Sequence, residues 1–454
     1  MYSLDDTIAA IGTPPGQGGI GIVRLSGPEA VSILRQVFQV THGRDLLPRR
    51  ITFGQVIDPA TDEALDEALA FYIPAPHTYT RQDVAEIQGH GSPMSLQRIL
   101  NLVLRHGARL AEPGEFTLRA FVNGRLDLAQ AEAVLDMIQA RTEAGHRIAM
   151  TQLEGRLSDA VRGVRRQLLE VLAYLEASID FTDDEVPPQD IVEPLSNLLN
   201  GIGQLLRDAD QGIIYRQGMR AAIVGRPNVG KSSLLNALLR VERAIVTEVP
   251  GTTRDTLEET INLRGVPLVL VDTAGIAETE DQVERLGVIR SRQALRQADL
   301  ALLVVDGSQP VEAADREIAA LIGNRPAVLV VNKIDLGTAE AEFDVLPADV
   351  PCVRVSALTG AGMEALEEAL VNEVLSGRAI TSDRPMVSNP RHKALLAQAA
   401  EHVEAAVDAH EQGLPADFVS IDVMASVTAL GEITGETAGE DLLNAIFSQF
   451  CVGK

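Results

Sequence analysis

The fold of the central part of this chain is decided by the stretch Gly225-Arg226-Pro227-Asn228-Val229-Gly230-Lys231-Ser232-Ser233. The stretch follows an apolar run at residues 221–224 and precedes a helix-like run at 234–239, as a phosphate-binding P-loop of pattern G-x-x-x-x-G-K-[ST] requires. Its glycines let N–H groups wrap the phosphates, Lys231 neutralises the β and γ oxygens, and the hydroxyl of Ser232 ligates Mg²⁺. The residues expected to contact the nucleotide here are Asn228, Val229, Gly230, Lys231, Ser232 and Ser233.

Further apolar runs extend the same fold beyond this loop. Patterns typical of buried strands occur at residues 268–271, 300–305 and 327–331, and helical stretches separate them. Strands that alternate with helices form a mostly parallel, doubly wound sheet, which binds its ligand at the carboxyl ends of the strands. The sequence therefore predicts a Ras-like P-loop domain over residues 215–380.

Base selection is expected from the string Asn332-Lys333-Ile334-Asp335, directly after the strand predicted at 327–331. The carboxylate of Asp335 only accepts hydrogen bonds, so it matches the N1–H and the exocyclic amine of guanine and pairs poorly with adenine. The string Ser356-Ala357-Leu358 is expected to give a backbone donor to the guanine carbonyl, although a plain strand-to-loop turn is an alternative for it. The predicted nucleotide is therefore GTP.

Two more strings complete the motif order of a GTPase. Asp272-Thr273-Ala274-Gly275 ends the predicted strand at 268–271, which places Asp272 near Mg²⁺ and the Gly275 amide near the γ-phosphate. Upstream of that strand, Thr253 is expected to complete the metal shell. The residue after Gly275 is Ile276, so the polar group that small GTPases use at this position to orient water is missing.

The composition of the 454 residues limits the classes of function. The 39 Lys and Arg against 64 Asp and Glu give a net charge of −25, so no large basic face is available to hold nucleic acid by counterion release. Two cysteines, Cys352 and Cys451, are too few for a disulfide framework and fit a reducing cytoplasm. No apolar run approaches the ~20 residues of a membrane span, and the acidic N-terminus lacks a secretory pattern. We expect a cytoplasmic protein without membrane contact.

Helical patterns surround the predicted nucleotide domain on both sides. Apolar residues recur every three or four positions between Leu157 and Leu175, and similar stripes follow at 195–206 and after residue 380. We expect residues 119–214 and 381–454 to form one helical bundle, into which 215–380 is inserted. Residues 1–118 mix short apolar runs with Gly and Pro turns, which predicts a separate α/β domain. The predicted fold is therefore multidomain, with α/β and all-α parts.

A resemblance narrows the type of GTPase. The loop at 225–233 together with Gly251-Thr252-Thr253-Arg254-Asp255 resembles the potassium-dependent GTPases with hydrophobic switch residues. The resemblance implies that K⁺ stands where an arginine finger would, beside the charge of the transition state. Its implied ligands are Asn228, the carbonyls of Thr247 and Val249, and Thr252. The nucleotide-contacting segment is expected to comprise Thr247, Glu248, Val249, Pro250, Gly251, Thr252 and Thr253.

Three further strings resemble one family over essentially the whole chain, the tRNA modification GTPase MnmE (TrmE) family. They run from Asp6-Thr7-Ile8 to Arg24-Leu25-Ser26-Gly27, over residues 112–132, and through the terminal Phe450-Cys451-Val452-Gly453-Lys454. The resemblance implies an N-terminal domain that dimerises and binds 5-formyltetrahydrofolate or a related folate. It also implies a helical domain that carries the tail and an inserted GTPase domain.

The resemblance implies roles for single residues as well. Folate binding is implied for Arg24, Glu86, Arg125 and Lys454, with Arg125 at a position where lysine is common in the family. Without the resemblance, surface ion pairing is the better explanation of Arg24 and Glu86. Cys451 is implied to act in the modification chemistry, whereas its sequence context favours a packed apolar thiol. Glu284 is implied to orient the hydrolytic water, so the expected catalytic residues are Glu284, Lys231 and Cys451.

The leading hypothesis is a K⁺-activated enzyme that hydrolyses GTP to GDP and phosphate. The resemblance implies that hydrolysis is coupled to a carboxymethylaminomethyl-type modification at carbon 5 of the wobble uridine of certain tRNAs. It further implies a homodimer and a flavoprotein partner, MnmG. Two alternatives stay open: a ribosome-assembly GTPase that switches RNA docking, which would need a basic appendage, and a folate-dependent one-carbon enzyme with a regulatory GTPase.

Overall fold

The computed structural model describes residues 5–41, 45–181, 186–241, 259–271, 291–337, 343–375 and 386–453. The chain forms two compact units, one made of Met1–Leu135 with Thr428–Lys454 and the other of Asp136–Val427. No helix within the described ranges combines the length and the apolar character that a membrane crossing needs.

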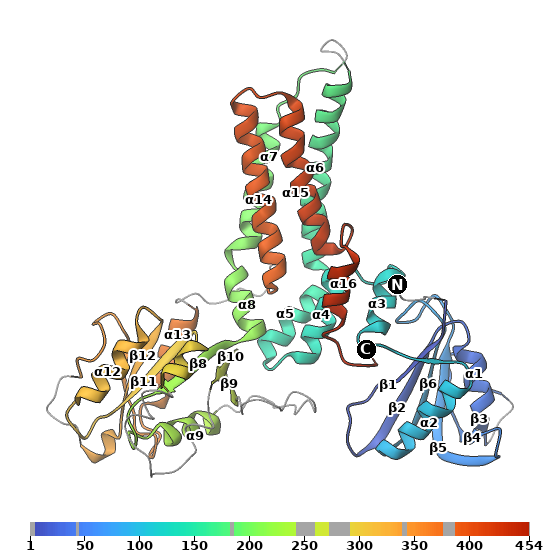
Figure 1. The fold of residues 1–454 in the computed structure, drawn as a ribbon, viewed down its shortest axis with the longest axis horizontal. Coiled ribbons are helices and arrows are strands. Elements are labelled where there is room, and N and C mark those ends of the chain that lie inside the picture. Colours follow the sequence, from blue (N-terminus) through green and yellow to red (C-terminus); the bar gives the residue numbers. More distant parts are fainter. Residues whose placement is uncertain are drawn as a thin grey trace. The chain divides into compact units, whose positions relative to one another are not determined.

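The first unit is built on a seven-stranded sheet of order β3-β4-β5-β6-β2-β1-β7 (Figure 1). α1 (Ala30–Val37) and α2 (Pro93–Arg105) cover one face, because their apolar side chains, such as Ile33 and Ile99, pack on Ala70 and Ile87 of the sheet. This arrangement confirms the α/β domain predicted at the N-terminus. The strands are β1 (Ile8–Ile11), β2 (Gly18–Ser26), β3 (Phe38–Val40), β4 (Thr52–Asp58), β5 (Glu63–Ile73), β6 (Val84–Gly91) and β7 (Arg109–Leu110).

A small helical cluster completes the first unit. It contains α3 (Glu115–Val122), the start of α4 (Leu128–Gln139) and α16 (Glu440–Phe447). Phe447 and Phe450, with ring centres 5.5 Å apart, pack among apolar residues of α3 and α4. Beyond them, Val452 forms an isolated antiparallel bridge with Pro113, and Gly453 lies so close to Ile11 that a Cβ would be 2.5 Å from its carbonyl oxygen. The tail therefore belongs structurally to the first unit.

The second unit contains a bundle of long helices from two distant parts of the sequence (Figure 1). α6 (Arg156–Asp180) buries Leu157, Leu168 and Leu175, as its apolar spacing predicts. α7 packs against α6 and α14, and Nε of Arg165 on α6 donates to the carbonyl of Val427 on α15 at 3.3 Å. Helices from the two sides of the nucleotide domain therefore meet, as expected. The other helices are α5 (Glu143–Leu153), α7 (Val192–Arg207), α8 (Ala209–Gln217), α14 (Pro390–Glu411) and α15 (Ala416–Thr434).

A six-stranded sheet of order β13-β12-β11-β8-β10-β9 forms the rest of the second unit. All neighbouring strands are parallel except β9 and β10, and the central β11 (Leu300–Asp306) is buried along its whole length. Because β8, β11 and β12 are parallel, the loops that follow them meet at one edge. The other elements are β8 (Met219–Val224), β9 (Glu259–Leu263), β10 (Val266–Leu270), β12 (Ala327–Asn332), β13 (Cys352–Arg354), α9 (Lys231–Val241), α12 (Ala313–Ile322), the 3₁₀ helix η1 (Ile334–Leu336) and α13 (Met363–Leu375).

The predicted fold class is confirmed. The strands expected at 268–271, 300–305 and 327–331 correspond to β10, β11 and β12, and the sheet has the parallel order that they imply. The domain boundaries at 118, 214 and 380 stay a prediction. The two compact units group residues 119–135 and 428–454 with the N-terminal segment.

Candidate functional site

The phosphate loop connects β8 to α9 at the carboxyl edge of the second sheet. Gly225 and Gly230 have φ values of 152° and 97°. A Cβ on Gly225 would lie 2.3 Å from the carbonyl oxygen of Val304, and one on Gly230 would lie 2.3 Å from Nδ2 of Asn332. Glycine is therefore required at both positions, for conformation and for space. The loop sits in the strand–loop–helix context that the sequence predicts.

Lys231 reaches back across this loop. Its Nζ donates to the carbonyl oxygens of Gly225 at 2.9 Å and Arg226 at 2.6 Å. Burial lowers the pKa of Lys231 to about 8, because desolvation disfavours the charged form. The ammonium is still mostly protonated at neutral pH and supplies positive charge for phosphate. Ser232 and Ser233 are exposed in the first turn of α9, where helix N–H groups favour anions.

Asn332, at the end of β12, joins three of the predicted motifs. Its side chain is buried, and its Nδ2 donates to the carbonyl of Val229 in the phosphate loop at 2.9 Å. Its Oδ1 accepts from the N–H of Ala357 at 3.0 Å. One side-chain amide therefore holds the phosphate loop and the loop of Ser356, Ala357 and Leu358 at the same strand end.

Lys333 makes a second connection to the phosphate loop. Its Nζ donates to the carbonyl of Asn228 at 2.6 Å and forms an ion pair with Asp306 at 2.7 Å. Asn228 and Lys333 have φ values of 63° and 65°, a region that asparagine tolerates better than most residues. Asp335, in η1, is exposed and free of the core. The described residues of the predicted guanine-nucleotide site therefore lie together. Asp306, which pairs with Lys333, also belongs to this cluster, although no sequence motif indicated it.

The other predicted nucleotide and tail residues lie outside the described residues. They are Thr247, Glu248, Val249, Pro250, Gly251, Thr252, Thr253, Asp272, Thr273, Ala274, Gly275, Glu284 and Lys454. The described ligands that the sequence predicts for the two cations, Ser232 and Asn228, offer hydroxyl, amide and carbonyl oxygens. Mg²⁺ and K⁺ both take oxygen ligands, so these residues fit the two ions.

A second cluster of predicted residues lies in the first unit, where β2 pairs with β6. Arg24 and Glu86 are register partners, and Nε of Arg24 donates to Oε1 of Glu86 at 2.7 Å. The guanidinium of Arg24 lies 5.9 Å from the ring centre of Phe116. Ion pairing of Arg24 and Glu86, which the sequence alone favours, is present in the structure. The expectation that it lies at the surface is wrong, because Glu86 is only 9% exposed. The strand register itself places this carboxylate in the sheet.

Arg125 reaches the same cluster through a tyrosine. Its guanidinium lies 4.6 Å from the ring centre of Tyr79, whose Oη shares a hydrogen bond with Oγ1 of Thr117 at 3.0 Å. Burial raises the pKa of Tyr79, against the opposing charges of Arg125 and Arg24. The structure therefore brings Arg24, Glu86 and Arg125 together around Tyr79. Sequence reasoning missed Tyr79, which belongs to no motif, and also Phe116 and Thr117, which stand inside a quoted string.

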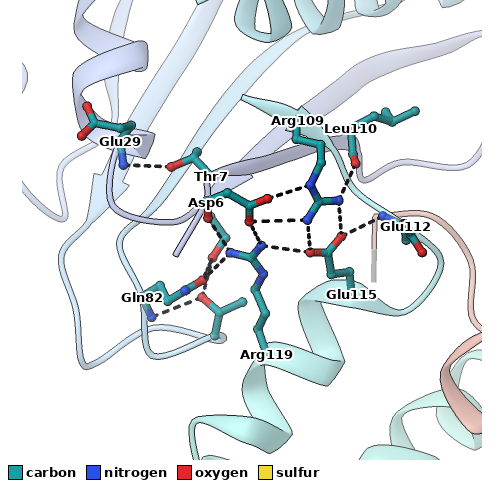
Figure 2. A network of polar contacts seen from close by, with 11 residues as sticks. Asp6, Thr7, Glu29, Gln82, Arg109, Leu110, Glu112, Glu115 and Arg119 are labelled. Atoms are coloured by element: carbon teal, nitrogen blue, oxygen red, sulfur yellow. Dashed lines mark hydrogen bonds and ion pairs between the residues drawn. The ribbon is translucent and has the colours of Figure 1, made fainter. Parts of the chain in front are cut away.

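An ion network fixes the helix that carries Phe116 and Thr117 (Figure 2). Arg109 on β7 donates to Asp6 at 2.7 Å and to Glu115 at 2.6 Å, and the fully buried Arg119 donates to the same two carboxylates. Burial alone would raise the pKa of Glu115, but hydrogen bonds from Arg109, the Glu112 N–H and Arg119 outweigh it and hold that pKa below its usual range. The network thereby joins α3 to the segment before β1.

Cys451 corrects one expectation. The thiol lies on an exposed residue, while the neighbouring Phe450 is buried, so the packed-thiol interpretation is wrong. The carbonyl of Cys451 accepts from the N–H of Gly114 at 3.4 Å, at the start of α3. The tail is therefore held to the first unit by its backbone and Phe450, and the thiol is accessible.

Known proteins match this chain over nearly its whole length. A family model described as the GTP-binding protein TrmE N-terminus matches residues 7–125, and a model of the MnmE helical domain matches residues 128–451. The tRNA modification GTPase MnmE of Roseiflexus sp. (strain RS-1) is 52% identical over 460 residues, which cover 99% of both chains. The chain belongs to the MnmE family.

Further MnmE relatives give the same coverage. The tRNA modification GTPase MnmE of Alkaliphilus metalliredigens (strain QYMF) is 50% identical over 460 residues, which span 99% of this chain and all of that protein. The resemblance inferred from the sequence motifs is thus confirmed, and with it the class of the protein, a GTP hydrolase. The roles predicted for single residues stay predictions.

Proposed function

We propose that this chain is a K⁺-dependent GTPase whose turnover drives modification of the wobble uridine of certain tRNAs at carbon 5. The modification is of the carboxymethylaminomethyl type and takes place in the cytoplasm, in a homodimer that works with the flavoprotein MnmG. The observation that supports the GTPase part best is the position of Asn332, which holds the phosphate loop and the base-reading loops together. The tRNA part is supported by full-length similarity to tRNA modification GTPases.

The residues of the phosphate loop bind and orient the nucleotide. The loop N–H groups and Lys231 hold the β- and γ-phosphates, and Ser232 with Thr253 holds Mg²⁺, which neutralises charge on the phosphate oxygens. Asp272 and the Gly275 amide complete this end of the site. Asp335 accepts from guanine, and the N–H groups near Ala357 donate to its carbonyl. Glu284 orients the hydrolytic water through a second water.

Dependence on K⁺ is supported by what stands beside the phosphates. Asn228 is exposed next to Lys231, and Lys333 holds its backbone in the left-handed region. Together with the carbonyls of Thr247 and Val249 and with Thr252, which lie outside the described residues, Asn228 would supply the oxygen ligands of a monovalent ion. Ile276 stands where a polar group would otherwise orient water. A K⁺ held by these ligands supplies the positive charge that the transition state needs.

Folate binding is proposed for the cluster around Tyr79. Glu86 accepts hydrogen bonds from a pterin amine, and Arg24 and Arg125 hold carboxylate or carbonyl oxygens. Lys454 follows Gly453, which lies against β1, the strand that pairs with Arg24 on β2. The exposed thiol of Cys451 supports a role in the modification chemistry rather than in packing. An acidic chain of this kind leaves most of the basic surface for tRNA to its partner.

The ion dependence is tested by measuring GTP hydrolysis and GDP binding in KCl and in NaCl. K⁺ should raise the rate by at least about 10-fold with little change in GDP affinity, because the ion acts on transition-state charge. Asn228→Ala should lose this activation, while Asn324→Ala, at an exposed asparagine between α12 and β12, should retain it. Equal rates in both salts would reject the ion mechanism.

The tRNA function is tested in cells. Deletion of the gene, followed by mass spectrometry of tRNA nucleosides, should show loss of the carbon-5 adduct of the wobble uridine. Re-expression of the wild-type chain should restore the adduct, and Lys231→Ala should not. An unchanged nucleoside profile in the deletion strain would favour the ribosome-assembly alternative.

A further inference from the structure

The phosphate loop contains an arginine, Arg226, whose side chain contacts the start of α12. Nε of Arg226 donates to Oδ1 of Asp315 at 2.8 Å, and its Nη1 pairs with Oε1 of Glu312 at 2.5 Å. The side chain of Arg226 is only 14% exposed. Both carboxylates stand at the start of α12, which follows β11 in the sequence. The guanidinium of Arg226 is therefore held by two carboxylates at the start of α12.

The acceptor end of this contact is rigid. Asp315 is 1% exposed, and its second oxygen, Oδ2, accepts from the N–H of Glu312 at 3.0 Å within the capping box of α12. Further along α12, Ile318 and Ile322 are buried in a core cluster with the central strands. If Arg226 turned away, a buried carboxylate would lose its cation, which is strongly unfavourable. The pairing therefore fixes Arg226 to the core of the domain.

The backbone of Arg226 carries this constraint to the phosphate site. Its carbonyl oxygen accepts from Nζ of Lys231 at 2.6 Å, next to the similar bond to Gly225. The same residue thus contacts α12 with its side chain and the phosphate-binding lysine with its main chain. A change at Asp315 can reach Lys231 through one residue.

We infer that Arg226 is a positioning residue, which anchors the phosphate loop to α12 and so orients Lys231. The inference rests on the GTPase class of the family and does not depend on the proposed K⁺ or tRNA functions. The two roles of an arginine differ in what they affect. An anchor shapes the ground-state site that GTP and GDP share, whereas an arginine finger acts on hydrolysis alone.

The first test compares nucleotide affinity with turnover in Arg226→Ala. The affinities for GTP and for GDP should both fall by about tenfold, while kcat at saturating GTP changes by less than about threefold. Arg316→Ala is the matched control, because among the contacts described the exposed side chain of this α12 arginine bonds only to the carbonyl of Asp344. A loss of kcat by about 10³-fold or more at unchanged GDP affinity would overturn the inference and make Arg226 a finger.

The second test asks whether Arg226 acts through Asp315. Asp315→Asn should reproduce the equal loss of GTP and GDP affinity, and the double variant Arg226→Ala with Asp315→Asn should be no weaker than the worse single variant. If the affinity loss of the double variant equalled the product of the two single losses, the residues would act separately and Arg226 would not anchor the loop through Asp315. Circular dichroism at the assay temperature verifies folding. If Arg226→Ala unfolds, Arg226→Lys replaces it, with an expected loss of about threefold in both affinities and none in kcat.

Discussion

Lys333 donates from its Nζ to the carbonyl oxygen of Asn228 at 2.6 Å, across 105 positions of sequence. The same ammonium is paired with Asp306, at the end of β11. A residue of the base-reading motif therefore holds the backbone of a residue at the phosphate end of the site. The residues predicted to bind the two ends of the nucleotide therefore belong to one connected structure, so a change at one end should be measurable at the other.

Asp335→Asn should change the preferred base. The carboxylate accepts from two donors of guanine, whereas an amide can also donate, and it therefore suits the extra carbonyl of xanthine. Hydrolysis of GTP and of xanthosine triphosphate should be compared at equal concentrations, with Lys333 and Asn332 left intact. If the preference for GTP is unchanged, Asp335 does not read the base.

Asn332→Ala should weaken both the fold and the site. The change leaves the buried carbonyl of Val229 and the N–H of Ala357 without their partner, which costs about 2 kcal/mol of unfolding free energy. GDP affinity should fall at the same time, because the phosphate loop and the loop of Ala357 lose the side chain that hydrogen-bonds to both. Chemical denaturation and GDP titration measure the two effects. Asn324→Ala should change neither, and similar behaviour of the two variants would contradict the role of Asn332.

Lys231 gives the site a pH dependence. Because burial lowers the pKa of Lys231 to about 8, GDP affinity should fall by up to about fourfold between about pH 7 and 8.5 as the free ammonium loses its proton. Lys231→Met should bind weakly, with no such slope. The folded-state pKa lies below the unfolded value, so this group alone makes the nucleotide-free protein more stable as the pH rises above about 8. A slope retained in Lys231→Met would assign the titration to another group.

Glu115→Gln tests the network of Figure 2. Removing this charge takes one of the two described carboxylate partners from the buried Arg119, so the free energy of unfolding should drop by about 3 kcal/mol near pH 7. Since the folded-state pKa of Glu115 is lowered, its stabilisation exists above the ordinary pKa of glutamate and is lost as the pH falls through the lowered value. The two proteins should therefore converge in acid. Glu63→Gln, in an exposed pair with Arg98, should cost less than about 1 kcal/mol.

Tyr79 should orient Arg125 for the proposed folate. Tyr79→Leu removes the ring beneath the guanidinium and should weaken binding of 5-formyltetrahydrofolate by about fivefold. Tyr79→Phe keeps the ring and loses only the bond to Thr117, so most of the affinity should remain. Calorimetric titration of the purified full-length protein with the folate distinguishes the two variants. Equal affinities in Tyr79→Leu and wild type would exclude the tyrosine.

The nucleotide domain was predictable because its signals are local. A P-loop must follow a strand and open a helix, and the base-reading string must follow another buried strand, so periodicity and spacing place Gly225, Lys231 and Asn332 together. The apolar spacing of α6 likewise indicates its buried face. Asp306 and Asp315 could not be found in this way, since each is one acid among 64 until the sheet brings it to Lys333 or Arg226.

The cluster of Arg24, Glu86, Arg125 and Tyr79 was less predictable. Arg24 and Glu86 are 62 residues apart, and only the register of β2 with β6 makes them partners. Tyr79 stands in a loop segment without a motif, and its contact with Arg125 depends on the fold of α3 between them. The burial of Glu86 and the exposure of Cys451 both depend on long-range packing. The local sequence therefore favoured a surface position for Glu86 and a packed thiol for Cys451.

The docking of residues 447–453 on the first unit has a consequence for biogenesis. Leu118 and Leu128 share a core cluster with Phe447 and Phe450, and Val452 bridges Pro113. A ribosome must therefore synthesise all of residues 136–427 before these early apolar groups receive their cover. During that interval Leu118 and Leu128 lack these C-terminal contacts, so the apolar core of the first unit is completed only after synthesis of the chain has nearly ended.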